Sequence, residues 1–163
     1  MLDNRPGMTD AERLEATVDE LAARLTALSE PSFTQRAGAD DWTAAEVVGH
    51  MAELVSYWAR VATAVAAEPG RSFGRALDDP DRLGAVTAAN AIPRGELLAR
   101  LRHASHEASQ AIRAFDAGQW ETAGIHPANG SMTVGEIVYE LMVEHAIAHA
   151  HQALVAAGAG QAD

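Results

Sequence analysis

Residues 137–154 read IVYELMVEHAIAHAHQAL, and this stretch sets the class of fold that we expect. Its apolar side chains recur three and four residues apart, which is the period of an amphipathic α-helix. His145 and His149 are four residues apart, so an α-helix places their imidazoles on one face, about one turn apart. The same face carries Val134, Val138, Leu141, Met142 and Gln152. We therefore expect both imidazoles on the core side of the helix, where a divalent metal ion would be their simplest ligand.

Three more segments of the chain show the same helical period. They span residues 10–28, 43–67 and 93–115, and the last helix spans residues 133–157. A threonine followed three residues later by a glutamate forms a capping box at three of the four starts: Thr9 and Glu12, Thr43 and Glu46, Thr133 and Glu136. Pro93 is expected at the first position of the remaining helix. These features predict an all-α four-helix bundle.

The connection between the second and third helices is long for a bundle. It runs from Pro69 to Ile92, and Asp79 followed by Pro80 indicates a short extra helix within it. Such a crossover is typical of bundles whose helices do not simply alternate in direction. A chain of 163 residues suits one hydrophobic core, so we expect residues 1–163 to form a single domain.

Charge and apolar content exclude several classes of partner. The formal net charge is −11 and no basic cluster is present, so we expect no binding to nucleic acid. No apolar stretch approaches the ~20 residues of a membrane span, and residues 1–15 are too polar for a signal peptide. We therefore expect a cytoplasmic protein that has no membrane partner.

The absence of two residue types narrows the chemistry further. The chain contains no cysteine, which excludes disulfides, zinc–thiolate sites and cysteine nucleophiles. It also contains no lysine, which excludes Schiff-base chemistry and the Walker-type phosphate loop. No Glu-x-x-His pair occurs, so the carboxylate-rich di-iron site of some helical bundles is excluded as well.

A third histidine, His50, lies beside the apolar stripe of the second helix. Facing His145 and His149 inside the bundle, it would complete a site of three imidazole nitrogens. Three protein ligands leave open positions on the ion, as in catalytic zinc sites. We expect Zn²⁺ there, with Ni²⁺, Fe²⁺ or Mn²⁺ as alternatives. Three core histidines that bind no metal are the simplest competing interpretation.

Other polar residues are candidates for supporting roles around these histidines. Glu53, Glu144 and Gln152 could orient the imidazoles by accepting hydrogen bonds from ring N–H groups. Arginines in the long connection could bind an anionic co-substrate; the candidates are Arg71, Arg75 and Arg82.

The remaining histidines are expected away from this site. His103, His106 and His151 fall off the apolar faces of their helices and should be exposed to solvent. His126 lies in a loop rich in glycine, proline and asparagine before the last helix. It is the only further histidine that we expect to be able to reach the metal.

Two motifs resemble those of the DinB/YfiT-like family, which includes the metal-binding domain of mycothiol-dependent maleylpyruvate isomerase. They are DWTAAEVVGHMAEL at residues 41–54 and EHAIAHAHQ at residues 144–152. The positions that match the family pattern are Trp42, Thr43, Glu46, His50, His145, His149 and Gln152. The resemblance implies a bundle with a three-histidine divalent metal site and open water positions. It also implies a homodimer and, in some members, transfer or isomerisation assisted by a low-molecular-weight thiol.

Two functions from different classes follow. The first is a metal-dependent enzyme, a transferase or isomerase that uses mycothiol or a similar thiol and acts on a small molecule. The alternative is a non-catalytic, metal-binding or structural dimeric bundle with a stress-related role. The homodimer has support in the residues too, because Val48, Val55 and Ala62 form an apolar face on the back of the second helix. We expect a monomer to leave this face exposed.

Overall fold

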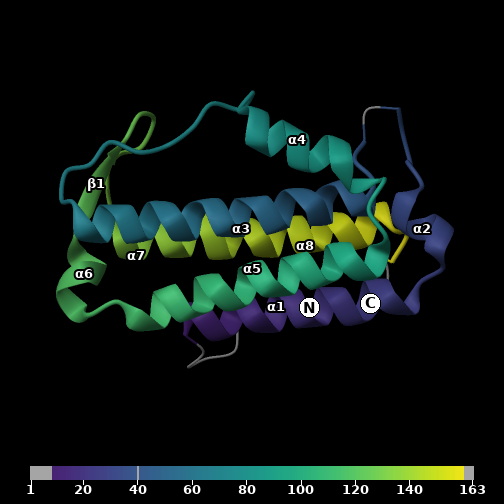
Figure 1. The fold of residues 1–163 in the computed structure, drawn as a ribbon, viewed down its shortest axis with the longest axis horizontal. Coiled ribbons are helices and arrows are strands. Elements are labelled where there is room, and N and C mark those ends of the chain that lie inside the picture. Colours follow the sequence, from purple (N-terminus) through teal and green to yellow (C-terminus); the bar gives the residue numbers. More distant parts are fainter. Residues whose placement is uncertain (1–8, 40, 160–163) are drawn as a thin grey trace.

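The computed structural model describes residues 9–39 and 41–159, and its architecture is the expected all-α four-helix bundle (Figure 1). The long helices are α1 (Asp10–Ala27), α3 (Ala44–Ala67), α5 (Arg94–Ala114) and a final helical segment. That segment joins α7 (Val134–Glu136), the π-helical η1 (Ile137–Glu144) and α8 (His145–Ala156). The shorter elements are α2 (Glu30–Thr34), α4 (Pro80–Ala89), α6 (Ala117–Glu121), β1 (Ala123–His126) and β2 (Gly130–Thr133). Within the described ranges, no helix is long and apolar enough to cross a membrane.

The helices pack as a ring in which chain neighbours are not always spatial neighbours. α1 packs against α5 and α8, and α3 packs against the same two helices from the other side. The crossover after α3 carries the chain back along the bundle before α5 begins, so α3 and α5 run in the same direction (Figure 1). The expected departure from simple alternation is confirmed, and it places α3 beside α8, the two helices that carry the candidate ligands.

All three capping boxes form as the sequence predicts. In each, the threonine hydroxyl accepts a hydrogen bond from the glutamate backbone N–H, and the glutamate carboxylate accepts one from the threonine N–H. Such a cap stabilises a helix by about 1 kcal/mol. α5 begins at Arg94, so Pro93 occupies the cap position and not the first helical position that we expected.

The last helix keeps a row of apolar residues facing the core by becoming π-helical in its first half. The buried residues of this row stand four apart: Val134, Val138, Met142, Ala146, Ala150 and Leu154. Four residues of an α-helix turn through about 400°, so such a row drifts by about 40° at each step. A π-helical turn holds more residues and rotates the row back toward the core. The π-helical segment η1 ends at Glu144, so it also sets the direction in which His145 leaves the helix.

The crossover helix α4 packs closely on the first half of α3, and Gly49 makes this approach possible. A β-carbon at Gly49 would lie 2.8 Å from the carbonyl oxygen of Ala85 and 2.8 Å from the β-carbon of Ala89, both in α4. Real β-carbons do not approach other atoms so closely. Because Gly49, next to His50, has no side chain, α4 can lie this close to α3. The short extra helix that the sequence predicts is thus present and covers α3.

The apolar face expected on the back of α3 is not exposed. Val48 and Val55 are 0% exposed and Ala62 is 1% exposed, because α3 packs against α4, α5 and α8. The exposed patch that supported a homodimer is therefore absent, and that inference from the residues was wrong. The homodimer stays a prediction that rests on the family resemblance alone.

A short β-hairpin precedes the last helix, where the sequence predicts only a loop. β1 and β2 pair antiparallel, from Ala123 opposite Thr133 to His126 opposite Gly130. Ser72 in the crossover forms a bridge with Ile125, which ties the start of the crossover to this hairpin. Strands of four residues around a turn rich in glycine, proline and asparagine are too short to give an alternating pattern that sequence analysis can detect.

Candidate metal centre

His50 from α3 and His145 and His149 from α8 come together between the two helices. One ring nitrogen of each can be chosen so that all three lie within 4.8 Å of one another. The His50 and His149 rings meet edge to face with centroids 4.7 Å apart, and the His145 and His149 rings stack at 4.8 Å. The antiparallel packing of α3 and α8 thus gathers the three imidazoles that the sequence analysis singled out.

The three rings differ in burial, which gives the cluster an open side. His50 is only 2% exposed, His149 is half-buried and His145 is exposed. The helical period predicts His145 and His149 on the core stripe itself, but Ala146 and Ala150 occupy that stripe. Each histidine directly precedes a residue of this buried row, which repeats every four positions. Both imidazoles therefore leave the helix at the edge of the buried face. Leu141 and Gln152, which we placed on the same stripe, are half-buried and exposed.

Trp42 forms one wall of the cluster. Its ring meets His50 edge to face at a centroid distance of 5.3 Å and stacks on His149 at 6.4 Å with an interplanar angle of 14°. It lies in the two residues that lead into α3, so the Thr43 cap that starts the helix also fixes where Trp42 stands. An indole at this place shields the imidazoles from water on one side.

The imidazoles are held in the neutral form, which is the form that binds metal ions. Burial lowers the pKa of His50 to about 3, with further lowering from the charges of His149, Arg82 and His145. The pKa of His149 is also lowered, mainly by burial, and that of His145 is lowered because its neighbours partly desolvate the ring, although the residue as a whole is exposed. At neutral pH the three rings therefore offer unshared electron pairs.

Two buried ring nitrogens have no hydrogen-bond partner among the described residues: Nδ1 of His50 and Nε2 of His149. Buried polar atoms in folded proteins are nearly always paired, so such atoms indicate a missing ligand. The other nitrogen of His149, Nδ1, lies 2.7 Å from Oε1 of Gln152. If the amide oxygen accepts the Nδ1 proton, the Nε2 electron pair is directed into the cluster. The donor set therefore fits a divalent metal ion.

Of the three residues that we expected to orient the imidazoles, only Gln152 contacts one in this way. Glu53 instead binds Arg75, whose guanidinium nitrogens lie 2.5 and 2.6 Å from its two carboxylate oxygens. Glu144 binds Arg13 at 2.5 Å and so joins the last helix to α1. Both carboxylates are thus engaged by arginines.

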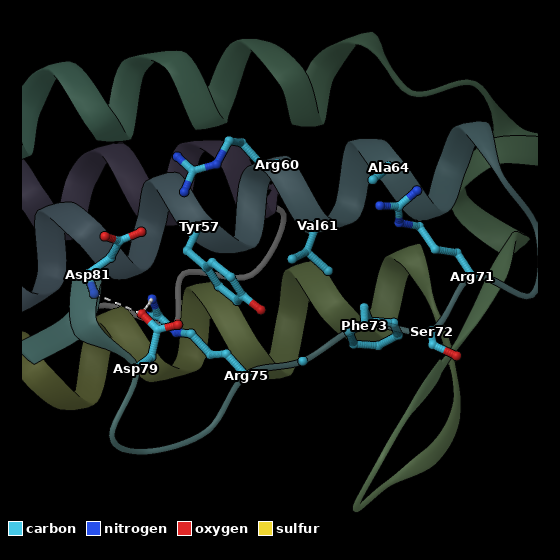
Figure 2. Close-up of a pocket in the computed structure, with 11 residues that line it drawn as sticks. Tyr57, Arg60, Val61, Ala64, Arg71, Ser72, Phe73, Arg75, Asp79 and Asp81 are labelled. Atoms are coloured by element: carbon cyan, nitrogen blue, oxygen red, sulfur yellow. Dashed lines mark hydrogen bonds and ion pairs between the residues drawn. The ribbon is translucent and has the colours of Figure 1, made fainter.

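Arg75 also borders a cavity of about 380 Å³ between α3 and the crossover (Figure 2). Its guanidinium carbon lies 4.0 Å from the centre of the Tyr57 ring, and one of its nitrogens lies 3.6 Å from Asp79. Phe73 closes another side of this cavity. None of the three clustered histidines lines it, so the cavity lies apart from the candidate metal ligands.

The remaining histidines do not join the cluster. His103, His106 and His151 are exposed, as the sequence predicts. His126 lies at the end of β1, where its ring contacts Phe73 and its Nδ1 accepts hydrogen bonds from the backbone N–H groups of residues 128 and 129. Its Nδ1 is therefore already engaged in hydrogen bonds, and His126 is not part of the three-histidine group.

The helical faces alone indicate neither the contact of Trp42 with the imidazoles nor the place of Arg82. Trp42 stands outside the periodic segments, and only its position in the family motif indicated a role. Arg82 was one of three arginines proposed as an anion-binding group, and periodicity could not choose between them. The carbon of its guanidinium lies 5.7 Å from the centre of the Trp42 ring, which places it at the cluster.

Two proteins whose solved structures have the same fold are described as dependent on a metal or on a thiol. YfiT from Bacillus subtilis, a probable metal-dependent hydrolase with an unusual four-helix bundle topology, superposes with a TM-score of 0.71 at 15% identity. The match covers 96% of this chain and 91% of YfiT. The H52A mutant of a mycothiol-dependent maleylpyruvate isomerase superposes with a TM-score of 0.66 at 11% identity. There the match covers 96% of this chain but 62% of the isomerase, and likenesses at such identities show the fold alone.

Sequence comparison gives the family. No curated protein matches the chain at a significant level. The DinB superfamily, however, matches residues 13–153, a range that contains both helical motifs and all three clustered histidines. The chain belongs to the DinB superfamily.

Proposed function

We propose that this protein is a divalent-metal-dependent enzyme whose ion is held by His50, His145 and His149. The observation that carries the proposal is the cluster itself: three imidazoles whose ligand atoms lie within 4.8 Å, two of them with a buried nitrogen that has no partner among the described residues. Neutral imidazoles without a neighbouring carboxylate ligand suit Zn²⁺, and also Ni²⁺ or Fe²⁺.

The open side of the cluster supports a catalytic role over the structural alternative. A structural zinc site is closed by four protein ligands, whereas a catalytic site keeps a position for water or substrate. The chain has no cysteine to complete such a shell, and His126 is engaged elsewhere. His145 is exposed, so a small molecule can reach the ion from that side.

The nucleophile in this proposal is a water or a low-molecular-weight thiol at the open position. A bound divalent ion would lower the pKa of that water or thiol, so that a nucleophile forms near neutral pH. The protein contributes fixed ring orientations through Gln152 and a water-excluding wall through Trp42. YfiT is described as a probable metal-dependent hydrolase and the isomerase as mycothiol-dependent, and these descriptions support water and a thiol as the two candidates here.

Metal content of protein purified without a histidine tag tests the ligand set. We expect one divalent ion per chain by elemental analysis, and its loss in the variant H50Q/H145Q/H149Q. The matched control H103Q/H106Q/H151Q changes three exposed histidines and should keep the ion. Equal metal content in both variants would refute the proposed site.

Spectroscopy of the cobalt-substituted protein tests whether the site is open. Adding a small thiol should produce a sulfur-to-metal charge-transfer band, and H126N should leave that band intact because His126 is not a ligand in this proposal. A spectrum that neither thiol nor other anions change would indicate a closed site, and the non-catalytic alternative would then be favoured.

A further inference from the structure

Arg82 lies at the edge of the cluster formed by His50, His145 and His149. Its guanidinium carbon is 5.7 Å from the centre of the Trp42 ring, and Trp42 is in ring contact with two of the three histidines. Because Trp42 borders the cluster, the guanidinium over its ring lies at the edge of the space that a ligand of the metal would use.

The neighbouring arginines are already bound to carboxylates, whereas Arg82 is not. Arg75 is bound to Glu53 through both guanidinium nitrogens, and Arg71 is bound to Glu68 at 2.6 Å. Arg82 donates one hydrogen bond to the backbone carbonyl of Leu77 at 2.7 Å, and no carboxylate pairs with it in the described part of the chain. A guanidinium has five N–H donors. Arg82 therefore keeps donors and charge for an anion.

The place of Arg82 depends on how closely α4 approaches α3. Arg82 is in the first turn of α4, where Asp79 caps the helix by accepting from the backbone N–H of Arg82 at 3.2 Å. Gly49, beside His50, allows α4 to pack against α3 because a β-carbon there would collide with Ala85. Gly84 lies in α4, one turn from Ala88, and a β-carbon added there would have no neighbour within 4 Å. Gly49 is thus a positioning residue, and Gly84 offers a matched control in the same helix pair.

We propose that Arg82, positioned through Gly49, binds a carboxylate of the small molecule that occupies the open metal position. The site would then select ligands that carry a carboxylate close to their metal-binding atom. This inference rests on the proposed metal site, and it names the class of ligand that the site prefers. A charge-assisted hydrogen bond from a guanidinium strengthens binding by about tenfold or more.

Two thiols that differ in one group test this preference in the cobalt-substituted protein. Mercaptoacetate carries a carboxylate where 2-mercaptoethanol carries a hydroxymethyl group, and each binds cobalt as a thiolate after losing its proton to solvent. The ratio of their dissociation constants, followed by the charge-transfer band, is the measurement. We expect the wild type to bind mercaptoacetate about tenfold more tightly and R82Q to lose most of that preference while still binding 2-mercaptoethanol. R71Q should keep the preference.

The glycine variants separate position from charge. G49A should shift α4 and reduce the preference, while G84A should leave it unchanged; thermal melts would establish that both remain folded. If the wild type binds no cobalt, the proposed function and this inference both fail. If it binds cobalt and both thiols but R82Q retains the tenfold preference, only the role of Arg82 is overturned.

Discussion

Gln152 and His149 are joined by a hydrogen bond of 2.7 Å between Oε1 and Nδ1, one turn apart on α8. This bond leaves Nε2 of His149 as the nitrogen that faces the cluster, where it is buried without a partner among the described residues. A second pair with a similar contact occurs on α5, where the Gln110 amide lies 2.8 Å from Nε2 of the exposed His106. The two pairs differ in their surroundings: only the first is beside the candidate metal ligands.

Replacing Gln152 with leucine should weaken metal binding without removing a ligand. The leucine cannot accept the Nδ1 proton, so His149 loses the partner that fixes its tautomer and ring orientation. Losses of about 10- to 100-fold in affinity are typical when such partners of metal-bound histidines are removed. Competition with a chromophoric chelator measures the affinity, and Q110L is the matched control. Equal affinities in Q152L and the wild type would exclude this role for Gln152.

Glu46 should stabilise the fold far more than the corresponding residue of α1. Its carboxylate is buried and accepts hydrogen bonds from Thr43 N at 2.8 Å, Arg36 at 2.5 Å and Asn90 at 2.9 Å. Burial acts to raise the pKa of Glu46, but these bonds outweigh it and the pKa is lowered. E46A would leave the buried Thr43 N–H unpaired and remove the carboxylate partner of Arg36 and Asn90, so we expect a loss of about 2–3 kcal/mol in unfolding free energy.

The capping box of α1 gives the control for that variant. Glu12 makes the same contacts with Thr9 but is exposed to solvent. E12A should therefore lower the unfolding free energy clearly less than E46A does. Urea unfolding of both variants measures the difference, and similar losses would mean that the bonds of Glu46 to Arg36 and Asn90 add nothing.

The sequence predicts the long helices well because local chemistry decides their starts. Each threonine–glutamate box satisfies backbone N–H groups within four residues, so its effect does not depend on the rest of the fold, and all three helices begin where the box predicts. The grouping of His50 with His145 and His149 follows from local patterns only in part: amphipathic helices in a bundle direct their apolar sides inward, but the two histidines of α8 lie at the edge of that side and not on it.

Features that arise between elements could not be predicted in the same way. The collision that a side chain at Gly49 would cause involves Ala85, 36 positions along the chain, and a lone glycine in a helix does not reveal it. The burial of Val48 likewise depends on the packing of neighbouring helices against α3. One missed feature did have a signal: the apolar residues of the last helix repeat every four positions from Val134 to Leu154, a period too long for a straight α-helix and in keeping with its π-helical segment.

Removing the metal should lower the thermal stability of the wild type. An ion that binds only the folded chain stabilises it by about 2.7 kcal/mol when its free concentration is 100 times the dissociation constant. We expect EDTA to lower the midpoint of thermal unfolding by several degrees, and H50Q/H145Q/H149Q to show no such change. A wild type that melts at the same temperature with and without EDTA would contradict metal binding at this site.

Acid should unfold the metal-free protein partly through His50. The unfolded side chain titrates near 6.5, whereas burial and the nearby positive charges lower the pKa in the folded chain to about 3. Between these values the unfolded chain binds a proton that the folded chain excludes, so stability falls as the pH drops from about 6.5 toward 3. At pH 5 the contribution of His50 is about 2 kcal/mol. Urea unfolding in EDTA at pH 7.5 and pH 5 measures it: the loss between the two should be about 2 kcal/mol smaller in H50Q, while H103Q should behave as the wild type. The same loss in H50Q as in the wild type would show that His50 does not titrate in this way.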